Sequence, residues 1–205
     1  MSDDFWGLSD GEDAASSANG EFDAGGGNLE PIPPETSVLA AIDEAKWDKD
    51  QQGNRFISLR WTVFQPEEFD NRKIFQKLWV TDADPRAKAD KVNAKRDKAK
   101  KMLAAIDTNA GGKLLAKPIM PTDEAMTLHL TNKPMVVKVM VWNMKDQMTG
   151  EMMRGNWVGA VAPKATPLST PEEIARSKDE MARSHATSAG QAAKGSRNLD
   201  DSIPF

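Results

Sequence analysis

Apolar and polar residues alternate along several segments in the middle of the chain, and this period of two is typical of β-strands with one buried face. Val38, Ala40 and Ile42 mark the first predicted strand. The later predicted strands are residues 55–64, 72–80, 135–144 and 151–161. Residues 49–54 contain a Gly-Asn pair and predict a turn that joins the first two strands into a hairpin.

The second and third predicted strands each have one apolar face and one mixed face. In the second strand the apolar face consists of Ile57, Leu59, Trp61 and Val63, and the mixed face of Phe56, Ser58, Arg60, Thr62 and Phe64. In the third strand Ile74, Leu78 and Val80 should point inward, and Lys73, Phe75, Lys77 and Trp79 outward. Lysines that alternate with aromatic rings are unusual on a surface that contacts only water.

Two helices are predicted between the third and fourth strands. Asp84 and Pro85 suit the N-cap and first position of a helix that should continue to about Asp107 and end before Gly111. A shorter helix should begin near Thr122. Three strands, a helix and two strands is the order of the OB fold, a five-stranded Greek-key barrel that binds oligonucleotides. The sequence therefore predicts a mainly β fold: a five-stranded OB-fold barrel with a long helix between strands 3 and 4.

Changes in composition divide the chain into four parts. These are a disordered acidic arm (1–30), the OB-fold domain (31–162), a flexible linker with a short helix at 171–184 (163–199), and a terminal hexapeptide (200–205). The arm holds six glycines and few apolar residues, so it cannot bury enough surface to fold alone. Prolines mark both boundaries of the domain, and Thr170 with Glu173 forms a capping box that predicts the helix in the linker.

The formal net charge of -4 is distributed unevenly. The first 30 residues contain eight acids and no base, whereas residues 31–162 contain 21 Lys and Arg against 17 Asp and Glu. A basic domain with an acidic extension indicates a polyanionic partner, with the extension able to compete for the same surface. Nucleic acid is the first candidate for that partner.

Several function classes are excluded or disfavoured by the composition. The chain has no cysteine and two histidines, so thiolate zinc sites and cysteine nucleophiles are excluded and we expect no metal site. No enzyme motif is found: the glycines before Lys113 lack the earlier glycine of a phosphate-binding loop. We therefore expect neither an enzyme nor a cofactor. No segment approaches the roughly 18 apolar residues of a membrane helix, and the acidic N-terminus is unlike a signal peptide, so a cytoplasmic location is expected.

The candidate binding residues combine aromatic rings, on which unpaired bases stack, with cations that neutralise phosphates. The third strand supplies Lys73, Phe75, Lys77 and Trp79, and the second supplies Phe56 and Arg60. Lys46, Trp47, Trp142, Arg154 and Trp157 lie near loops that flank the binding face of an OB fold. The alternative is a strand buried on both faces whose lysines reach outward. For Trp142 and Trp157, packing and binding roles remain open at this stage.

The final hexapeptide carries the most specific signal. Its candidate docking residues are Asp200, Asp201, Ile203, Pro204 and Phe205, and two acids before an apolar end suit a hydrophobic pocket with a basic rim. This hexapeptide resembles the acidic tip of bacterial single-stranded DNA-binding proteins, which ends in Asp-Asp-x-Ile-Pro-Phe. Residues 35–161, including the Gly-Asn turn, residues 71–79 and residues 156–159, are similar to phage-encoded single-stranded DNA-binding proteins. The longer basic helix and the acidic arm depart from the bacterial type, so a monomer or dimer is expected.

The resemblance implies a protein that coats and protects single-stranded DNA during phage DNA replication, recombination and repair, in the cytoplasm of a bacterial host. It also implies that the tip docks replication and recombination proteins. In the mechanism that we expect, Phe75 and Trp79 stack bases, and Lys73, Lys77 and Arg60 neutralise phosphates. Two alternatives remain: a recombination protein that anneals complementary strands, and an adaptor or virion protein that does not bind DNA.

Overall fold

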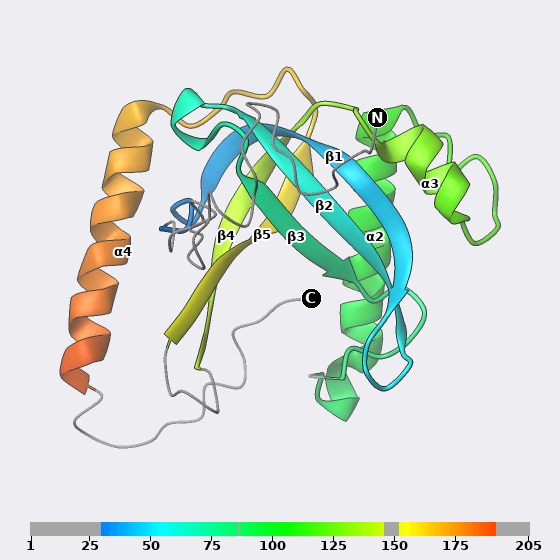
Figure 1. The fold of residues 1–205 in the computed structure, drawn as a ribbon, viewed down its shortest axis with the longest axis horizontal. Coiled ribbons are helices and arrows are strands. Elements are labelled where there is room, and N and C mark those ends of the chain that lie inside the picture. The colour runs from blue at the N-terminus through cyan, green and yellow to red at the C-terminus, as the bar shows by residue number, and fades with distance from the viewer. Residues whose placement is uncertain (1–29, 86, 146–151, 192–205) are drawn as a thin grey trace, which may run out of the picture. The chain divides into compact units, whose positions relative to one another are not determined.

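Five antiparallel strands form one curved sheet in the computed structural model, in the order β3-β2-β1-β4-β5 (Figure 1). The strands are β1 (Thr36–Lys49), β2 (Arg55–Gln65), β3 (Lys73–Leu78), β4 (Met135–Lys145) and β5 (Met152–Ala162). The structure describes residues 30–85, 87–145 and 152–191, with side chains up to residue 184. All five predicted strands are confirmed, and β1 and β2 form the predicted hairpin.

The apolar face of β2 is fully buried, as its alternation predicts. Ile57, Leu59, Trp61 and Val63 each have an exposed fraction of 0%. The same alternation holds in β3, where Ile74 and Leu78 are buried and the residues between them, apart from Gln76, are exposed. These residues define the inner face of the sheet, and the opposite side of β1, β2 and β3 is called the outer face below.

The sheet is not closed into the predicted barrel. Strands β3 and β5 are its two edges, and no backbone ladder joins them in the described part of the chain. Instead, the buried Gln76 of β3 donates a hydrogen bond from Nε2 to the Val158 carbonyl of β5 (3.1 Å), and its Oε1 accepts one from Trp61 Nε1 (3.1 Å). Because β3 has only six residues, it offers little backbone for a ladder with β5. The fold is a mixed α/β structure with an open sheet.

The long helix between β3 and β4 begins later than predicted. The 3-10 turn η2 (Ala89–Lys91) continues into α2 (Val92–Ala110), which gives 22 helical residues. Asp84 does not cap it, and its buried carboxylate pairs with Lys95 at 3.4 Å. The residues that follow Pro85 are charged residues and alanines without a large apolar side chain, so a helix there would bury little, and helices are stabilised mainly by packing. Gly111 ends α2 in a left-handed conformation (φ 116°).

The two shorter helices follow their sequence signals. Helix α3 (Asp123–Leu130) begins at Thr122, whose side chain accepts a hydrogen bond from the Ala125 amide (3.2 Å). Helix α4 (Pro171–Gln191) is longer than predicted, and Thr170 and Glu173 form the expected capping box. A short 3-10 turn, η1 (Glu67–Phe69), lies between β2 and β3. No helix in the described ranges is both long and apolar enough to span a bilayer.

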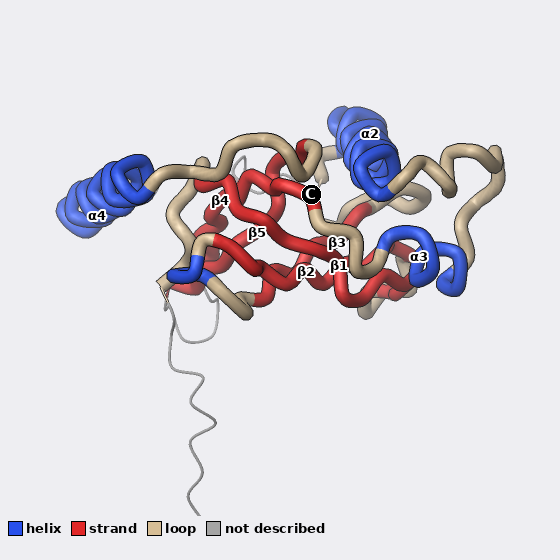
Figure 2. Tube along the Cα trace, turned by 90° about the horizontal axis from the view of Figure 1, so that it is seen from above, coloured by secondary structure: helices blue, strands red, loops and turns tan. Residues whose placement is uncertain are grey.

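The core lies between the inner face of the sheet and the helices α2 and α3. Ala99, Met102 and Ile106 of α2 and Met126 and Leu130 of α3 are buried in one cluster with the inner-face residues. Figure 2 shows α2 and α3 at the same end of the sheet and α4 at the other end. The outer face of β2 and β3 therefore carries no helix of this core.

Candidate nucleic-acid interface

Phe75 is the most exposed aromatic ring on the outer face, with 68% of its surface accessible. Its neighbours two residues away on β3, Lys73 and Lys77, are also exposed, and Arg60 is its partner across on β2. The predicted outward direction of these three β3 residues is confirmed. The sheet thus places one bare aromatic ring among three basic side chains.

Trp79 and Phe56 do not belong to this exposed group, so the prediction that their rings are exposed on the outer face is wrong. Trp79 is 6% exposed and Phe56 is 2% exposed, and their ring centroids lie 4.8 Å apart. Strand β3 ends at Leu78, and the Val80 amide bonds back to the Leu78 carbonyl (3.1 Å), so Trp79 leaves the alternation. The ammonium group of Lys77 lies 4.5 Å from the Phe56 centroid. Neither ring presents a free face to a base.

An ion-pair network lies beside Phe75 on the outer face. The Asp43 carboxylate accepts hydrogen bonds from Arg60 Nε, Thr62 Oγ1 and Lys73 Nζ, each at 2.9 Å. Glu44 pairs with Arg60 Nη1 at 2.9 Å and with Lys46 Nζ at 2.5 Å. Two carboxylates therefore engage three of the predicted phosphate-binding cations.

These contacts shift the protonation equilibria of the two acids. Burial by itself would raise the pKa of Asp43, but the hydrogen bonds from Lys73, Thr62 and Arg60 outweigh it and lower that pKa. The hydrogen bond from Lys46 lowers the pKa of Glu44 and, in turn, raises the pKa of Lys46. Both carboxylates are charged at neutral pH.

A β-bulge places both acids on the same side of the sheet. Ile42 pairs with Trp61 and Glu44 pairs with Arg60, so Asp43 is one extra residue in β1. Without the bulge, strict alternation would put neighbouring residues on opposite faces. Asp43 and Glu44 were not among the predicted site residues, although the sequence carries a signal for them: two consecutive acids interrupt an alternating apolar strand.

Lys46 and Trp47, both candidates from the first hairpin, are separated by the pleat. Lys46 pairs with Ser58 on the outer face, whereas Trp47 pairs with Ile57 on the inner face. The Trp47 indole donates to the Pro121 carbonyl (2.8 Å), and the Arg55 guanidinium lies 4.6 Å from the centroid of its ring. Trp47 therefore packs beside the core and does not join Phe75.

The candidates of the last hairpin form a separate group on β4 and β5. Trp142 pairs with Gly155 and Met140 pairs with Trp157, on the side of the hairpin away from the buried Val139. The Trp142 ring lies against Gly155 so closely that a Cβ atom there would be 2.5 Å from Cζ2. Both tryptophans are half-buried, and Arg154 is exposed. Strand β1 lies between this group and β2.

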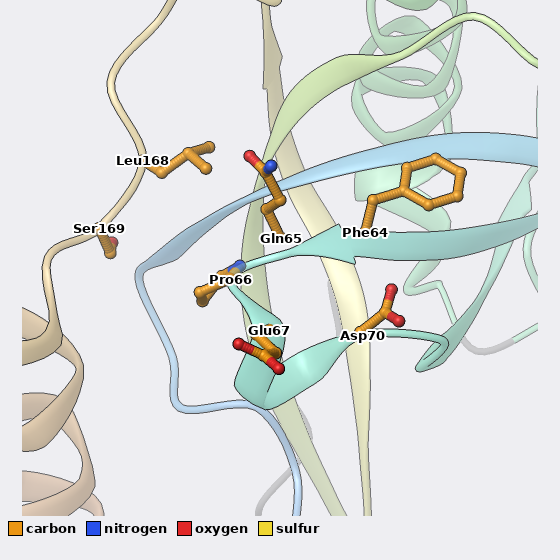
Figure 3. A pocket seen from close by; sticks show the side chains of 7 residues that line it. All are labelled: Phe64, Gln65, Pro66, Glu67, Asp70, Leu168 and Ser169. Carbon is orange, nitrogen blue, oxygen red and sulfur yellow. The ribbon is translucent and has the colours of Figure 1, made fainter.

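Phe64, at the end of β2, is a second exposed ring on the outer face, with 42% of its surface accessible. It borders an open groove of about 450 Å³ (Figure 3). The groove is lined by Phe64, Gln65, Pro66, Glu67, Asp70, Leu168 and Ser169. Because its charged residues are acids, this groove does not suit a phosphate.

The five residues predicted to dock proteins, Asp200, Asp201, Ile203, Pro204 and Phe205, lie outside the described residues, as do residues 1–29 of the acidic arm. No protein-family model matches the sequence, and no curated protein is significantly similar to it. The function therefore has to be inferred from the residues.

Proposed function

We propose that the protein binds single-stranded DNA on the outer face of β2 and β3, and that it coats and protects this DNA during phage replication and recombination. The observation that carries the proposal is the 68% exposure of Phe75 in the middle of a strand flanked by Lys73 and Lys77. Exposed aromatic rings and nearby cations are the two elements that a protein needs to bind single strands without sequence preference.

In this proposal the residues of the outer face have different roles. Phe75 stacks an unpaired base, and Lys77 neutralises a phosphate, since within the described residues it forms no ion pair. Arg60 and Lys73 border the ring while bound to Asp43. Trp79 and Phe56 pack against each other at the end of β3 instead of stacking bases. Phe64 offers a second ring. It lies four residues along β2 from Arg60, the partner of Phe75, which corresponds to about 14 Å between the Cα atoms of Phe64 and Phe75.

The strand order supports an OB-type binding domain. In the order β3-β2-β1-β4-β5, closing an OB barrel requires only that β3 and β5 pair, and Gln76 already links these two edges. We propose that the fold is an OB barrel left open at this seam, with α2 packed beside both edge strands. The β4–β5 hairpin, with Trp142, Arg154 and Trp157, then forms a second contact region for the strand.

We further propose that the terminal residues 200–205 recruit replication or recombination proteins. The support is the chemistry of the segment, two acids followed by Ile203, Pro204 and Phe205, and its resemblance to the bacterial tip. A variant that lacks residues 198–205 should bind DNA at least as tightly as the full chain and should lose those partners.

A binding titration tests the DNA-binding proposal. Fluorescence anisotropy with labelled oligothymidine measures Kd for the full chain and for Phe75→Ala. We expect Kd to rise about fivefold to 150-fold, because stacking contributes about 1–3 kcal/mol per base. Leu128→Ala on α3 is the matched control, since Leu128 is 71% exposed and lies outside the outer face.

Salt dependence separates stacking from phosphate contact. Lys77→Ala should make the slope of log K against log salt shallower by about 0.7, whereas Phe75→Ala should leave that slope nearly unchanged. If Phe75→Ala binds oligothymidine as tightly as Leu128→Ala does, the outer face is not the DNA-binding surface.

A further inference from the structure

The cations around Phe75 differ in whether they form ion pairs with carboxylates of the protein. Lys46, Arg60 and Lys73 are held by the Asp43 and Glu44 carboxylates at 2.5–2.9 Å. Two carboxylates thus offset half of the positive charge of Lys46, Arg60, Lys73 and Lys77, so the outer face around the exposed ring is less basic than its number of cations suggests.

This arrangement is built into the backbone. The bulge in β1 turns both Asp43 and Glu44 toward the outer face, and Asp43 accepts hydrogen bonds from two residues of β2 and one of β3. The side chain of Asp43 is 26% exposed, less than those of the cations it holds, which are 40% and 44% exposed. The carboxylate thus lies beneath the basic groups, where it lowers their attraction for an approaching phosphate.

Single-stranded and duplex DNA make different demands on such a surface. A duplex keeps its bases stacked inside and presents phosphates, so its nonspecific affinity depends on the number of phosphates that the protein neutralises. A single strand also offers bases for stacking on Phe75. Carboxylates that occupy the cations weaken the phosphate contribution for both forms but leave the stacking contribution intact.

We propose that Asp43 and Glu44 are specificity-determining residues that make the outer face select single strands over duplexes. The inference rests on the proposed function and adds the reason for its selectivity. Stacking on the uncharged ring of Phe75, which only unpaired bases can reach, then supplies most of the binding free energy at this site. The acids prevent the basic residues from acting as a general phosphate clamp.

The variants Asp43→Asn and Glu44→Gln test this role. Each keeps the shape of the side chain and removes one negative charge, which releases Lys73 in the first case and Lys46 in the second, and leaves Arg60 with one carboxylate partner in both. Asp179→Asn on the exposed side of α4 makes the same change in net charge outside the network and is the matched control. Glu44 is the more exposed of the two acids, so Glu44→Gln is the variant less able to disturb folding.

Affinities are measured for labelled oligothymidine and for a mixed-sequence duplex of equal length, across a series of salt concentrations. We expect both network variants to bind duplex up to about fivefold more tightly, the range of an exposed ion pair, with a smaller gain for oligothymidine. The ratio of duplex Kd to single-strand Kd should therefore fall. The salt slope for duplex should steepen by about 0.9 for each additional phosphate contact.

Two results would overturn the inference while leaving the proposed function intact. One is a Kd ratio in both network variants equal to that of Asp179→Asn. The other is weaker binding of oligothymidine by Asp43→Asn, which would show that the acid positions the cations for single strands. A wild-type chain that does not bind oligothymidine overturns the proposed function, and the selectivity inference with it.

Discussion

The link between the two sheet edges can be tested by replacing Gln76 with Met. Gln76 is 4% exposed, and its amide bonds Trp61 Nε1 and the Val158 carbonyl, both at 3.1 Å. Methionine has a similar length and no amide, so the change leaves a buried indole N–H and a buried carbonyl without these partners. Each such group costs about 1–3 kcal/mol, and we therefore expect the free energy of unfolding to fall by about 2–6 kcal/mol.

Urea denaturation followed by circular dichroism measures this loss. With a slope m of about 2 kcal/mol/M, the midpoint should fall by about 1–3 M while m stays constant. Gln65→Met, at an exposed position at the end of β2, is the matched control and should change the unfolding free energy by less than about 0.5 kcal/mol. If Gln76→Met is no less stable than the control, the amide does not hold β3 against β5.

Two further replacements test the placement of aromatic rings. Trp79→Ala should lower the unfolding free energy by about 3–5 kcal/mol because its ring is buried against Phe56. Phe75→Ala should change the unfolding free energy by less than about 0.5 kcal/mol because its ring is exposed. Equal losses for the two variants in urea denaturation would contradict this assignment. Gly155→Ala should displace the Trp142 indole, lower stability by about 1–3 kcal/mol and alter tryptophan emission. The same change made in a Trp142→Ala background should cost much less, and an undiminished cost in this double-mutant cycle would show that the ring is not the obstacle.

The candidate site was predictable from the sequence only where strand alternation continues. Lys73, Phe75 and Lys77 lie within β3 and point outward as predicted. Trp79 has the same spacing, yet it lies beyond the end of the strand and packs on Phe56. Periodicity specifies a face only while the chain remains extended, and nothing in the local sequence states that β3 stops at Leu78.

The engagement of Arg60 and Lys73 by Asp43 was missed for a related reason. Asp43 is separated from Lys73 by 30 residues, and the carboxylate reaches it only because a bulge shifts the register of β1 against β2. A bulge depends on how two strands pair, and one strand's sequence does not fix that pairing. Counting bases along the chain therefore overestimated the positive charge available to a phosphate.

Local patterns were sufficient for the five strands, the first hairpin, the inner face of β2, the cap of α3 and the capping box of α4, since each of these depends on residues close together in the chain. The late start of the long helix, the open seam bridged by Gln76, and the burial of Trp79 arise from contacts between distant segments. Such contacts exist only after the sheet has curved and α2 and α3 have packed on it. The sequence alone therefore determined that aromatic and basic residues are present in the predicted strands. Only the tertiary structure decided that Phe75 is the exposed ring and that Asp43 is the counter-charge of Arg60 and Lys73 beside it.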